Sequence, residues 1–465
     1  MALRRVRAPH IDFGVLRREL KLPEEYPAEA AEEAERSAAD PPVPPVDRTD
    51  LQFATIDPAT SLDLDQAMCL QRRSGGGYRV HYAIADVAAW VHPGGPLDAE
   101  TWRRGQTVYL PDGKVPLHPK VLSEDAASLL PDRPRPAVLW TIDLDADGAT
   151  VAVHVERALV RSRAKLDYER VQSDVDAGRL AEPVALLPEI GKLLIERGLA
   201  RGAINLPMPD QEIERDGDGW RLRLRAPLAV EEYNAQISLL TGVSAAKIMI
   251  DGRVGLLRTM PAPRAEAVEK LRAAAPALGV LWPAGVQAGA VIATLDPADP
   301  RAAAFLDQAA ELMRGAGYRA FEGQAPADAG HGAVAAPYAH VTAPLRRLAD
   351  RYATEVCLAL YGGAEVPDWV RQALPKLPEV MSSTDRVAGA AERGAVDLVE
   401  VVLLAGRVGE VFEAAVLDTA PGVVALDEPP VRARCEGDGL VPGTRVRVRL
   451  IEADPSRRKV VFGLA

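Results

Sequence analysis

The hydrophobic pattern of this chain changes its period twice, and these two changes constrain the fold more than any other feature of the sequence. Between residues 51 and 211, alternating apolar runs predict strands mixed with helices, and a Gly-rich turn at residues 74–77 predicts a hairpin. From residue 229 to about residue 405, Ala- and Leu-rich segments predict helices. Short alternating runs then return. This order of patterns indicates an α+β protein.

Three segments follow from these patterns. Residues 1–47 predict an N-terminal helical segment that ends in a Pro-rich linker. Residues 48–404 form the main domain, in which a β-rich half precedes a helical half. Residues 405–465 contain short strand-like runs separated by Gly and Pro turns. This spacing is typical of a small five-stranded barrel of the OB type.

The composition sets limits on the class of protein. Hydrophobic residues make up 48% and charged residues 26% of the 465 positions, which is typical of a soluble globular protein. No run approaches the roughly 18 apolar residues of a membrane span. The basic start, residues 1–10, precedes no apolar signal segment. We therefore expect a cytoplasmic protein without a membrane anchor.

The cysteines and the net charge exclude little else. Cys69, Cys357 and Cys435 lie far apart in the sequence, which disfavours a cysteine zinc site and a disulfide framework. The formal net charge of −11 does not exclude a nucleic-acid partner, because a local groove can be basic on an acidic body.

An acidic segment is the sharpest local feature of the sequence. Asp57, Asp63 and Asp65 lie within nine residues, between apolar strand-like runs. If Asp63 and Asp65 lie on extended backbone, their carboxylates point the same way, and a turn at Pro58 can bring Asp57 beside them. Such carboxylates repel one another unless a cation lies between them, and hard oxygen ligands favour Mg²⁺ or Mn²⁺. Metal-dependent phosphoryl chemistry, calcium binding and a solvated acidic loop all remain open from these residues alone.

A second segment carries adjacent arginines. Pro344 is expected in the first turn of a helix, with Thr342 as its N-cap. Arg346 and Arg347 would then lie near the positive end of the helix, where their planar groups suit phosphate oxygens. The alternative is that both arginines pair with surface acids.

A third group of cations lies in the expected barrel. Arg445, Arg447 and Arg449 alternate along one strand and therefore share a face, which is either a basic strip for phosphates or an ordinary solvated face. Other catalytic patterns are missing from the sequence: it has no phosphate-binding glycine loop, no H-E-x-x-H and no G-x-S-x-G.

Taken in order, these segments resemble the ribonuclease II/R family, whose catalytic part is called the RNB domain. The acidic segment at residues 55–67 is similar to the family's T-I-D…D-x-D-D-A signature, and residues 338–351 are similar to its T-S-P-I-R-R-Y-x-D segment. Further partial matches lie at residues 107–119, 121–129, 157–168, 202–207, 230–232 and 391–397. The resemblance covers roughly residues 48–400, and the closing barrel is similar to the family's S1-type module.

The resemblance implies a role for each of several residues. Asp57, Asp63 and Asp65 would hold catalytic Mg²⁺, with Mn²⁺ as an alternative. Tyr109 would stack on the last nucleotide, since ring-on-base stacking tolerates any sequence. Arg346 would grip the scissile phosphate and stabilise developing charge.

The resemblance assigns two further residues. Glu392, as a catalytic residue, would help to position the 3′ end of the substrate, and Arg347 is a weaker candidate for contact with a nearby phosphate. From the basic strip of the barrel, Arg445 and Arg447 would bind the substrate phosphates.

The resemblance also implies an activity and an architecture. The activity is metal-dependent, hydrolytic 3′→5′ exoribonuclease action on single-stranded RNA with release of nucleoside 5′-monophosphates. The architecture is an RNB-type catalytic domain, whose β-rich and helical halves enclose a narrow RNA channel, followed by an S1-like barrel. We expect a short form that lacks N-terminal cold-shock domains. Single-stranded RNA is the expected partner, and neither the residues nor the resemblance identifies a protein partner.

One departure from the family pattern bears on the activity. Gln66 stands at the fourth acidic position, where its amide oxygen would be a weaker metal ligand than a carboxylate. This substitution predicts a higher Mg²⁺ requirement or a preference for Mn²⁺. The alternative functions are a catalytically weakened RNA-binding protein of the same fold and a nuclease dedicated to processing one RNA 3′ end.

Overall fold

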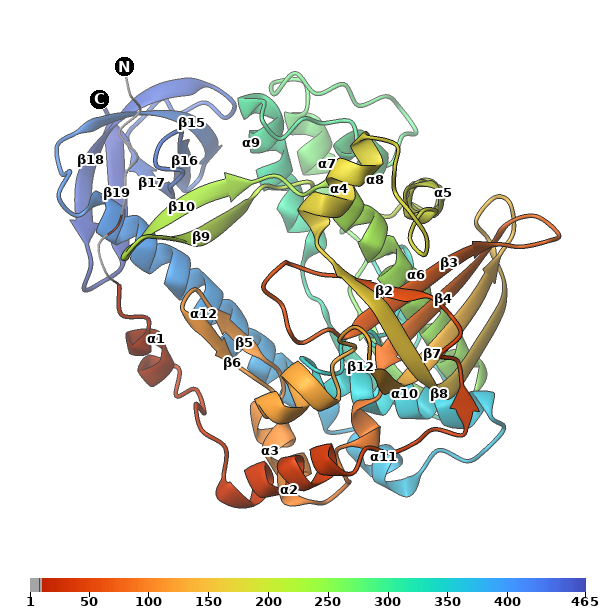
Figure 1. Ribbon diagram of the computed structural model, residues 1–465. Helices are drawn as coiled ribbons and strands as arrows, with labels where there is room; N and C mark the ends of the chain where they lie inside the picture. The colour runs from red at the N-terminus through yellow and green to blue at the C-terminus, as the bar shows by residue number, and fades with distance from the viewer. Residues whose placement is uncertain (1–7, 9–10) are drawn as a thin grey trace.

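The computed structural model describes Ala8 and residues 11–465, so most of the basic start lies outside the described residues. The described chain contains a mixed β-sheet, a helical half and a closed C-terminal barrel (Figure 1). The predicted α+β class and the predicted barrel are therefore confirmed. None of the described helices combines the length and the apolar character that a membrane crossing requires.

A six-stranded sheet forms the framework of the β-rich half. Its strands are β1 (Val46–Asp47), β2 (Phe53–Ile56), β3 (Gln66–Arg72), β4 (Tyr78–Ala85), β7 (Pro134–Leu144) and β8 (Thr150–Leu166). They lie in the order β1-β8-β2-β3-β4-β7, and β8 also pairs with β7. The long strand β8 therefore pairs with both β2 and β7, which are the first and last strands of the series β2-β3-β4-β7. The hairpin predicted around residues 74–77 is the one between β3 and β4.

Alternation along the strands explains why this sheet is covered on both faces. On β3, Met68 and Leu70 belong to one buried cluster, whereas Ala67 and Cys69 belong to another. Successive side chains of a strand point to opposite faces, so an uninterrupted apolar run needs partners on each. One face packs on helices of the helical half, and the other receives the N-terminal helix α2 (Ala28–Ala39).

The connections and the covering helices complete the β-rich half. They are α1 (Gly14–Glu19), α3 (Pro96–Arg104), β5 (Val108–Leu110), β6 (Gly113–Val115), α4 (Tyr168–Asp176), α5 (Leu187–Arg201), β9 (Asp210–Asp216) and β10 (Gly219–Arg225). Strands β5 and β6 form a short hairpin, and β9 and β10 form a longer one that reaches toward the barrel (Figure 1).

The helical half begins at the predicted residue but is not purely helical. Its helices are α6 (Ala229–Asp251), α7 (Ala265–Ala274), α8 (Ala288–Ile292), α9 (Pro300–Ala309), α10 (Leu348–Tyr361), α11 (Asp368–Ala373) and α12 (Leu377–Leu404). Short strands interrupt them: β11 (Val254–Thr259), β12 (Gly317–Glu322), β13 (Gly330–His331) and β14 (Ala336–Pro337). The prediction of helix throughout was wrong at these strands, because β11 and β12 gain their order from pairing with each other over a long sequence separation.

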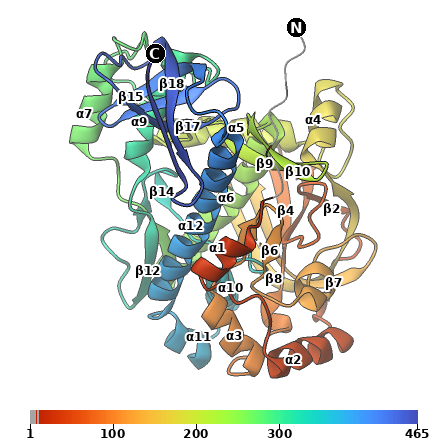
Figure 2. The ribbon, with the colours of Figure 1, turned by 90° about the vertical axis from the view of Figure 1, so that its left-hand side faces the viewer.

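The C-terminal barrel closes in the order β15-β16-β17-β19-β18. Its strands are β15 (Val411–Thr419), β16 (Gly422–Leu426), β17 (Arg432–Glu436), β18 (Arg445–Asp454) and β19 (Lys459–Leu464). The long helix α12 runs from the barrel into the main domain, and α1 lies against it (Figure 2). A single buried cluster joins the barrel, α12, α1 and the β5–β6 hairpin.

Candidate active site

The acidic segment forms the loop between β2 and β3. Strand β2 ends at Ile56, and the next backbone N–H, that of Asp57, donates to a carbonyl of β8. Buried Leu64 separates Asp63 and Asp65, as expected for extended backbone whose alternate side chains face the site. The Ser128 hydroxyl donates to the Leu62 carbonyl at 2.6 Å and accepts from the Leu64 N–H at 2.9 Å. One side chain therefore fixes the backbone on both sides of Asp63.

Burial dominates the electrostatics of this loop. It raises the pKa of Asp57 to about 7 and that of Asp65 to about 8, against the opposing effect of the Arg346 charge. The charge of Asp63 raises the pKa of both carboxyls further. Oδ2 of Asp57 is buried and has no hydrogen-bond partner among the described residues. Burial therefore favours the protonated form of both carboxyls unless a cation compensates their charge.

The arginine loop, residues 339–347, crosses this acidic loop. The Leu345 N–H donates to Oδ1 of Asp65 at 2.7 Å, and Nε of Arg346 lies 3.5 Å from Oδ2 of the same carboxylate. The Arg346 side chain is 45% exposed. Its guanidinium is therefore anchored at one edge and open to an anion at the other.

The predicted helix start was wrong in this loop. Helix α10 begins at Leu348, and the residue before it, Arg347, has extended backbone that bridges to Gln106. Thr342 is accordingly no N-cap, and Arg346 lies in a turn before the helix. Side chains of distant elements bind the polar groups of this turn, and these contacts are invisible in the local sequence.

Arg347 forms an ion pair with Asp350. Its guanidinium donates through Nε and Nη2 to the two oxygens of Asp350, both at 2.9 Å. Oδ1 of Asp350 also accepts from the Ala343 N–H at 2.7 Å. Asp350 is completely buried, the Arg347 side chain is 18% exposed, and the pair closes the arginine loop on itself. The prediction that Arg347 contacts a phosphate stays a prediction, and a phosphate would have to compete with the Asp350 carboxylate.

The β5–β6 hairpin docks on Asp63. Its Tyr109 hydroxyl donates to Oδ2 of Asp63 at 3.4 Å, while Lys114, opposite Tyr109 in the hairpin, places Nζ 2.7 Å from Oδ1. Lys114 also pairs with Glu124 at 3.0 Å. The Tyr109 side chain is 51% exposed, so its ring remains available for stacking.

Gln66 makes two hydrogen bonds within the protein. Its amide nitrogen donates to the Thr342 carbonyl at 2.6 Å, and its amide oxygen accepts from the Tyr82 hydroxyl at 2.7 Å. An amide oxygen can accept a second interaction, so the prediction of Gln66 as a fourth metal ligand stays a prediction.

Glu392 lies on α12, on the exposed side of the helix. On the same helix, Asp385 accepts from Gln106 at 3.1 Å and pairs with Arg258 at 3.3 Å, next to the arginine loop. Glu392 follows Asp385 by two turns, or about 10 Å along the axis. Within the described residues it makes no hydrogen bond or ion pair, so its carboxylate is free.

The predicted basic strip on β18 exists, but acids neutralise most of it. Arg445, Arg447 and Arg449 all lie on the exposed face, as alternation predicts. Arg445 pairs with Asp427, and Arg447 lies 3.7 Å from Glu413. An incoming phosphate would have to compete with these carboxylates.

A divalent cation has a chemically suitable but incomplete set of ligands. Across Ala8 and residues 11–465, no three His, Cys, Asp or Glu side chains are grouped tightly enough to hold a metal ion on their own. The predicted cage of Asp57, Asp63 and Asp65 is therefore not formed as such, and Lys114 compensates Asp63. The partnerless oxygen of Asp57 still fits a hydrated Mg²⁺, which usually keeps several waters and uses one or two carboxylates.

Four residues shape the site in ways that the sequence analysis did not assign, although all four lie in segments that resemble the family. Ser128 holds the backbone N–H of Leu64, 64 positions away, and Asp350 holds the N–H of Ala343 in the loop before its own helix. Burial lowers the pKa of His118 to about 4, so its ring is neutral and Nδ1–H donates to the Leu345 carbonyl at 3.0 Å. Lys114 pairs with an aspartate 51 positions earlier in the sequence. Only long-range contacts reveal these four roles.

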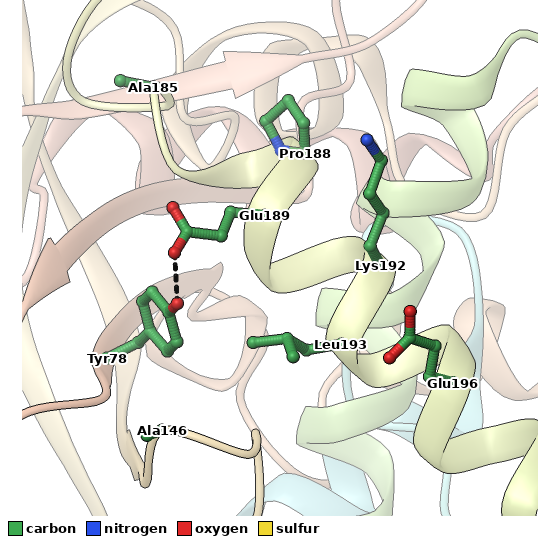
Figure 3. Close-up of a pocket in the computed structure, with 8 residues that line it drawn as sticks. All are labelled: Tyr78, Ala146, Ala185, Pro188, Glu189, Lys192, Leu193 and Glu196. Atoms are coloured by element: carbon green, nitrogen blue, oxygen red, sulfur yellow. Dashed lines mark hydrogen bonds between the residues drawn. The ribbon is translucent and has the colours of Figure 1, made fainter.

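The hollow drawn in Figure 3 is a separate feature of the surface. It has a volume of about 480 Å³ and is lined by Tyr78, Ala146, Ala185, Pro188, Glu189, Lys192, Leu193 and Glu196. Tyr78 pairs with Arg72 at the end of the β3–β4 hairpin opposite Gln66, so the hollow is about 20 Å from the acidic loop. The Tyr78 hydroxyl and Arg72 both bind Glu189, which already satisfies its carboxylate.

The fold and the site together define a class: an α+β protein that sets aspartates against an arginine in its main domain and ends in an OB-type barrel. Comparison with known proteins gives that class a family. The RNB domain model matches residues 46–361, and the RNase II-type exonuclease C-terminal S1 domain model matches residues 410–465. The chain belongs to the RNB family.

Individual relatives agree with this assignment. The chain is 26% identical to ribonuclease R of Escherichia coli K12, over 90% of this chain and 57% of that protein. It therefore spans little more than half the length of this curated relative. Ribonuclease R of Mycoplasma genitalium in complex with ribose-methylated single-stranded RNA matches with a TM-score of 0.86 at 19% identity, over 97% of this chain and 77% of that one. Yeast Ssd1, described as a pseudonuclease, matches with a TM-score of 0.69 at 18% identity, over 90% and 54%.

Proposed function

We propose that this chain is a hydrolytic exoribonuclease that shortens single-stranded RNA from its 3′ end, requires a divalent cation and releases nucleoside 5′-monophosphates. Membership of the RNB family supports the exoribonuclease class. The observation that carries the proposal is the contact between Arg346 and buried Asp65, beside the partnerless oxygen of Asp57. Carboxylates that can bind a cation thus lie beside an arginine that can bind a phosphate.

Mg²⁺, or Mn²⁺ in its place, is the proposed cofactor. Asp57 and Asp65 would hold it, with Asp63 contributing negative charge from the same loop. Such an ion activates water and neutralises charge on a phosphodiester. The chain's own contribution is to bury these carboxylates and to keep the backbone around them rigid through Ser128.

The remaining roles concern the RNA. Arg346 would hold the scissile phosphate and stabilise the charge that develops on its oxygens. The exposed ring of Tyr109 would stack on the terminal base, and the free carboxylate of Glu392 would bind near the 3′ end. Arg445 and Arg447 would guide the strand from the barrel. A preference for RNA over DNA would come from contacts to the 2′-hydroxyl.

The test is the digestion of 5′-labelled single-stranded RNA with Mg²⁺ or Mn²⁺, run beside the Asp65→Asn variant. The proposal expects a ladder that shortens to a small core with the wild type and full-length RNA with the variant. RNA that is bound but not cleaved by the wild type would favour the alternative, an RNA-binding protein without activity.

A further inference from the structure

Gln66 links β3, the arginine loop and β4 through its side-chain amide, and Tyr82 extends this link to α6. It begins β3, donates to the Thr342 carbonyl in the arginine loop, and accepts from the Tyr82 hydroxyl of β4. The Tyr82 oxygen also lies 2.7 Å from the Ser238 hydroxyl on α6. Because the single Tyr82 proton goes to Gln66, the Ser238 hydroxyl must donate to Tyr82. Tyr82 is completely buried, which makes each of these bonds costly to lose.

We propose that Gln66 is a positioning residue, which holds the arginine loop against the acidic strand and thereby sets the place of Arg346. Neighbouring Asp65 fastens the same loop at the Leu345 N–H. Two consecutive residues of one chain segment thus clamp the loop at Thr342 and Leu345, directly before the arginine. The proposed exoribonuclease activity is assumed only for the kinetic part of this inference.

The chemistry of the clamp requires an amide. Position 66 faces a carbonyl oxygen on one side and a hydroxyl donor on the other, so its side chain must both donate and accept. An aspartate can accept from Tyr82 but has no proton for the Thr342 carbonyl, and its charge would face that oxygen. Aspartate at this position is therefore expected to release the loop, even though it adds a fourth carboxylate.

This expectation separates a positioning role from a role as a weak metal ligand. If Gln66 were a weak ligand, Gln66→Asp would lower the Mg²⁺ concentration needed and raise kcat. If Gln66 positions Arg346, Gln66→Asp and Gln66→Ala would both lower kcat. A displacement of about 1 Å in a catalytic group can reduce the rate by about 100-fold, so a loss of about 10- to 100-fold is expected.

A double-mutant cycle tests whether the effect passes through Arg346. Both Gln66 substitutions are made in the wild type and in Arg346→Ala, and kcat and KM for single-stranded RNA are measured. In the wild type, kcat falls by about 10- to 100-fold while KM changes by less than about threefold; in Arg346→Ala, the same substitutions have almost no further effect. An equal loss in both backgrounds, or a gain of activity in Gln66→Asp, would overturn the proposal.

Hydrogen exchange provides a readout that needs no activity. The amides of residues 339–347 should exchange at least several-fold faster in Gln66→Asp and Gln66→Ala than in the wild type. The control is Gln71→Asp, at an exposed position of the same strand, which should leave this segment unchanged. Unchanged exchange in both Gln66 variants would refute the clamp. The two proposals can fail separately. If the wild type binds RNA without shortening it, and the Gln66 variants still exchange faster than the wild type, the proposed function is refuted while the positioning role of Gln66 is supported.

Discussion

At the scale of single residues, Arg346 is the residue on which the proposed activity depends most. One edge of its guanidinium lies against buried Asp65, while the Arg346 side chain itself is 45% exposed. A group that stabilises charge in the transition state is expected to matter strongly for the rate. We predict that Arg346→Ala lowers kcat by about 100- to 1,000-fold in the RNA digestion assay.

The matched control for this prediction is Arg133→Ala. Arg133 is 65% exposed and pairs with Asp125 at 3.2 Å, and Asp125 keeps Arg135 as a second partner. Replacement of Arg133 should leave kcat within about twofold of the wild type, since exposed ion pairs contribute little. An Arg346→Ala variant as active as Arg133→Ala would contradict the role of Arg346.

Tyr109 supplies a second prediction at this scale. Its ring is half exposed, and its hydroxyl makes only a long 3.4 Å contact to Asp63. Stacking contributes about 1–3 kcal/mol per base, so Tyr109→Ala should weaken RNA binding by about 5- to 150-fold. Tyr109→Phe keeps the ring and should bind almost normally. Both affinities are measured by titrating labelled RNA into the Asp65→Asn background. Equal weakening by both substitutions would assign the effect to the hydroxyl.

The residues of the site could be predicted only in part. Asp63 and Asp65 lie on either side of buried Leu64, which agrees with the predicted extended backbone, but the three aspartates do not form the predicted cage. The sequence did not predict that the Arg347 guanidinium donates to both oxygens of Asp350. That pairing depends on a turn whose geometry is set by distant hydrogen bonds.

At the scale of elements, helix α1 fastens several parts of the molecule together. Buried Leu16 packs against α12 at Gly394, where a Cβ would lie 2.9 Å from the Leu16 methyl group. Arg17 donates to both oxygens of Asp112, at the tip of the hairpin that carries Tyr109. Glu19 pairs with Arg458 of the barrel. The element therefore ties the hairpin, α12 and the barrel into one unit.

This packing makes α1 important for stability. Leu16→Ala removes a side chain that is 1% exposed and should lower the free energy of unfolding by about 2–5 kcal/mol. The neighbouring Val15, 38% exposed, is the control, and Val15→Ala should change it by no more than about 0.5 kcal/mol. Urea unfolding measures both. Similar midpoints for the two variants would show that α1 does not bear on the stability of the core.

The junction between α12 and the barrel predicts a pH dependence. Oε1 of Glu400 accepts from the Arg432 N–H of β17 at 3.0 Å and from Gln211 of β9 at 2.8 Å. Burial raises the pKa of Glu400 from 4.5 to about 7. The folded protein thus binds a proton more tightly than the unfolded chain, so this group should cost stability progressively as the pH rises from 4.5 to 7, and no further above that.

Glu400→Gln removes this titration. The difference between 4.5 and 7 corresponds to on the order of 3 kcal/mol, so the variant should melt above the wild type at pH 8 and close to it below pH 4.5. Melting temperatures are compared across this range, with Glu379→Gln, on the exposed side of the same helix, as the control. A difference between Glu400→Gln and the wild type that does not change with pH would contradict the assigned cause.

At the scale of the whole molecule, the sequence predicted the order of the sheet, the helical half and the barrel better than the contacts between distant segments. Period-2 alternation and Gly-rich turns were sufficient for the sheet and the barrel, because those signals are local. Strands β11 and β12 were missed because their pairing joins segments about sixty residues apart. The predicted RNA channel between the two halves stays a prediction.

The central claim is that RNA is hydrolysed from a free 3′ end at the site formed by the aspartates and Arg346. The most direct measurement compares a linear single-stranded RNA with a circle of the same sequence, each with the wild-type protein and Mg²⁺ or Mn²⁺, and identifies the products by chromatography. We predict that the linear RNA is converted to nucleoside 5′-monophosphates while the circle remains intact. Cleavage of the circle at the rate of the linear RNA, or persistence of both, would contradict it.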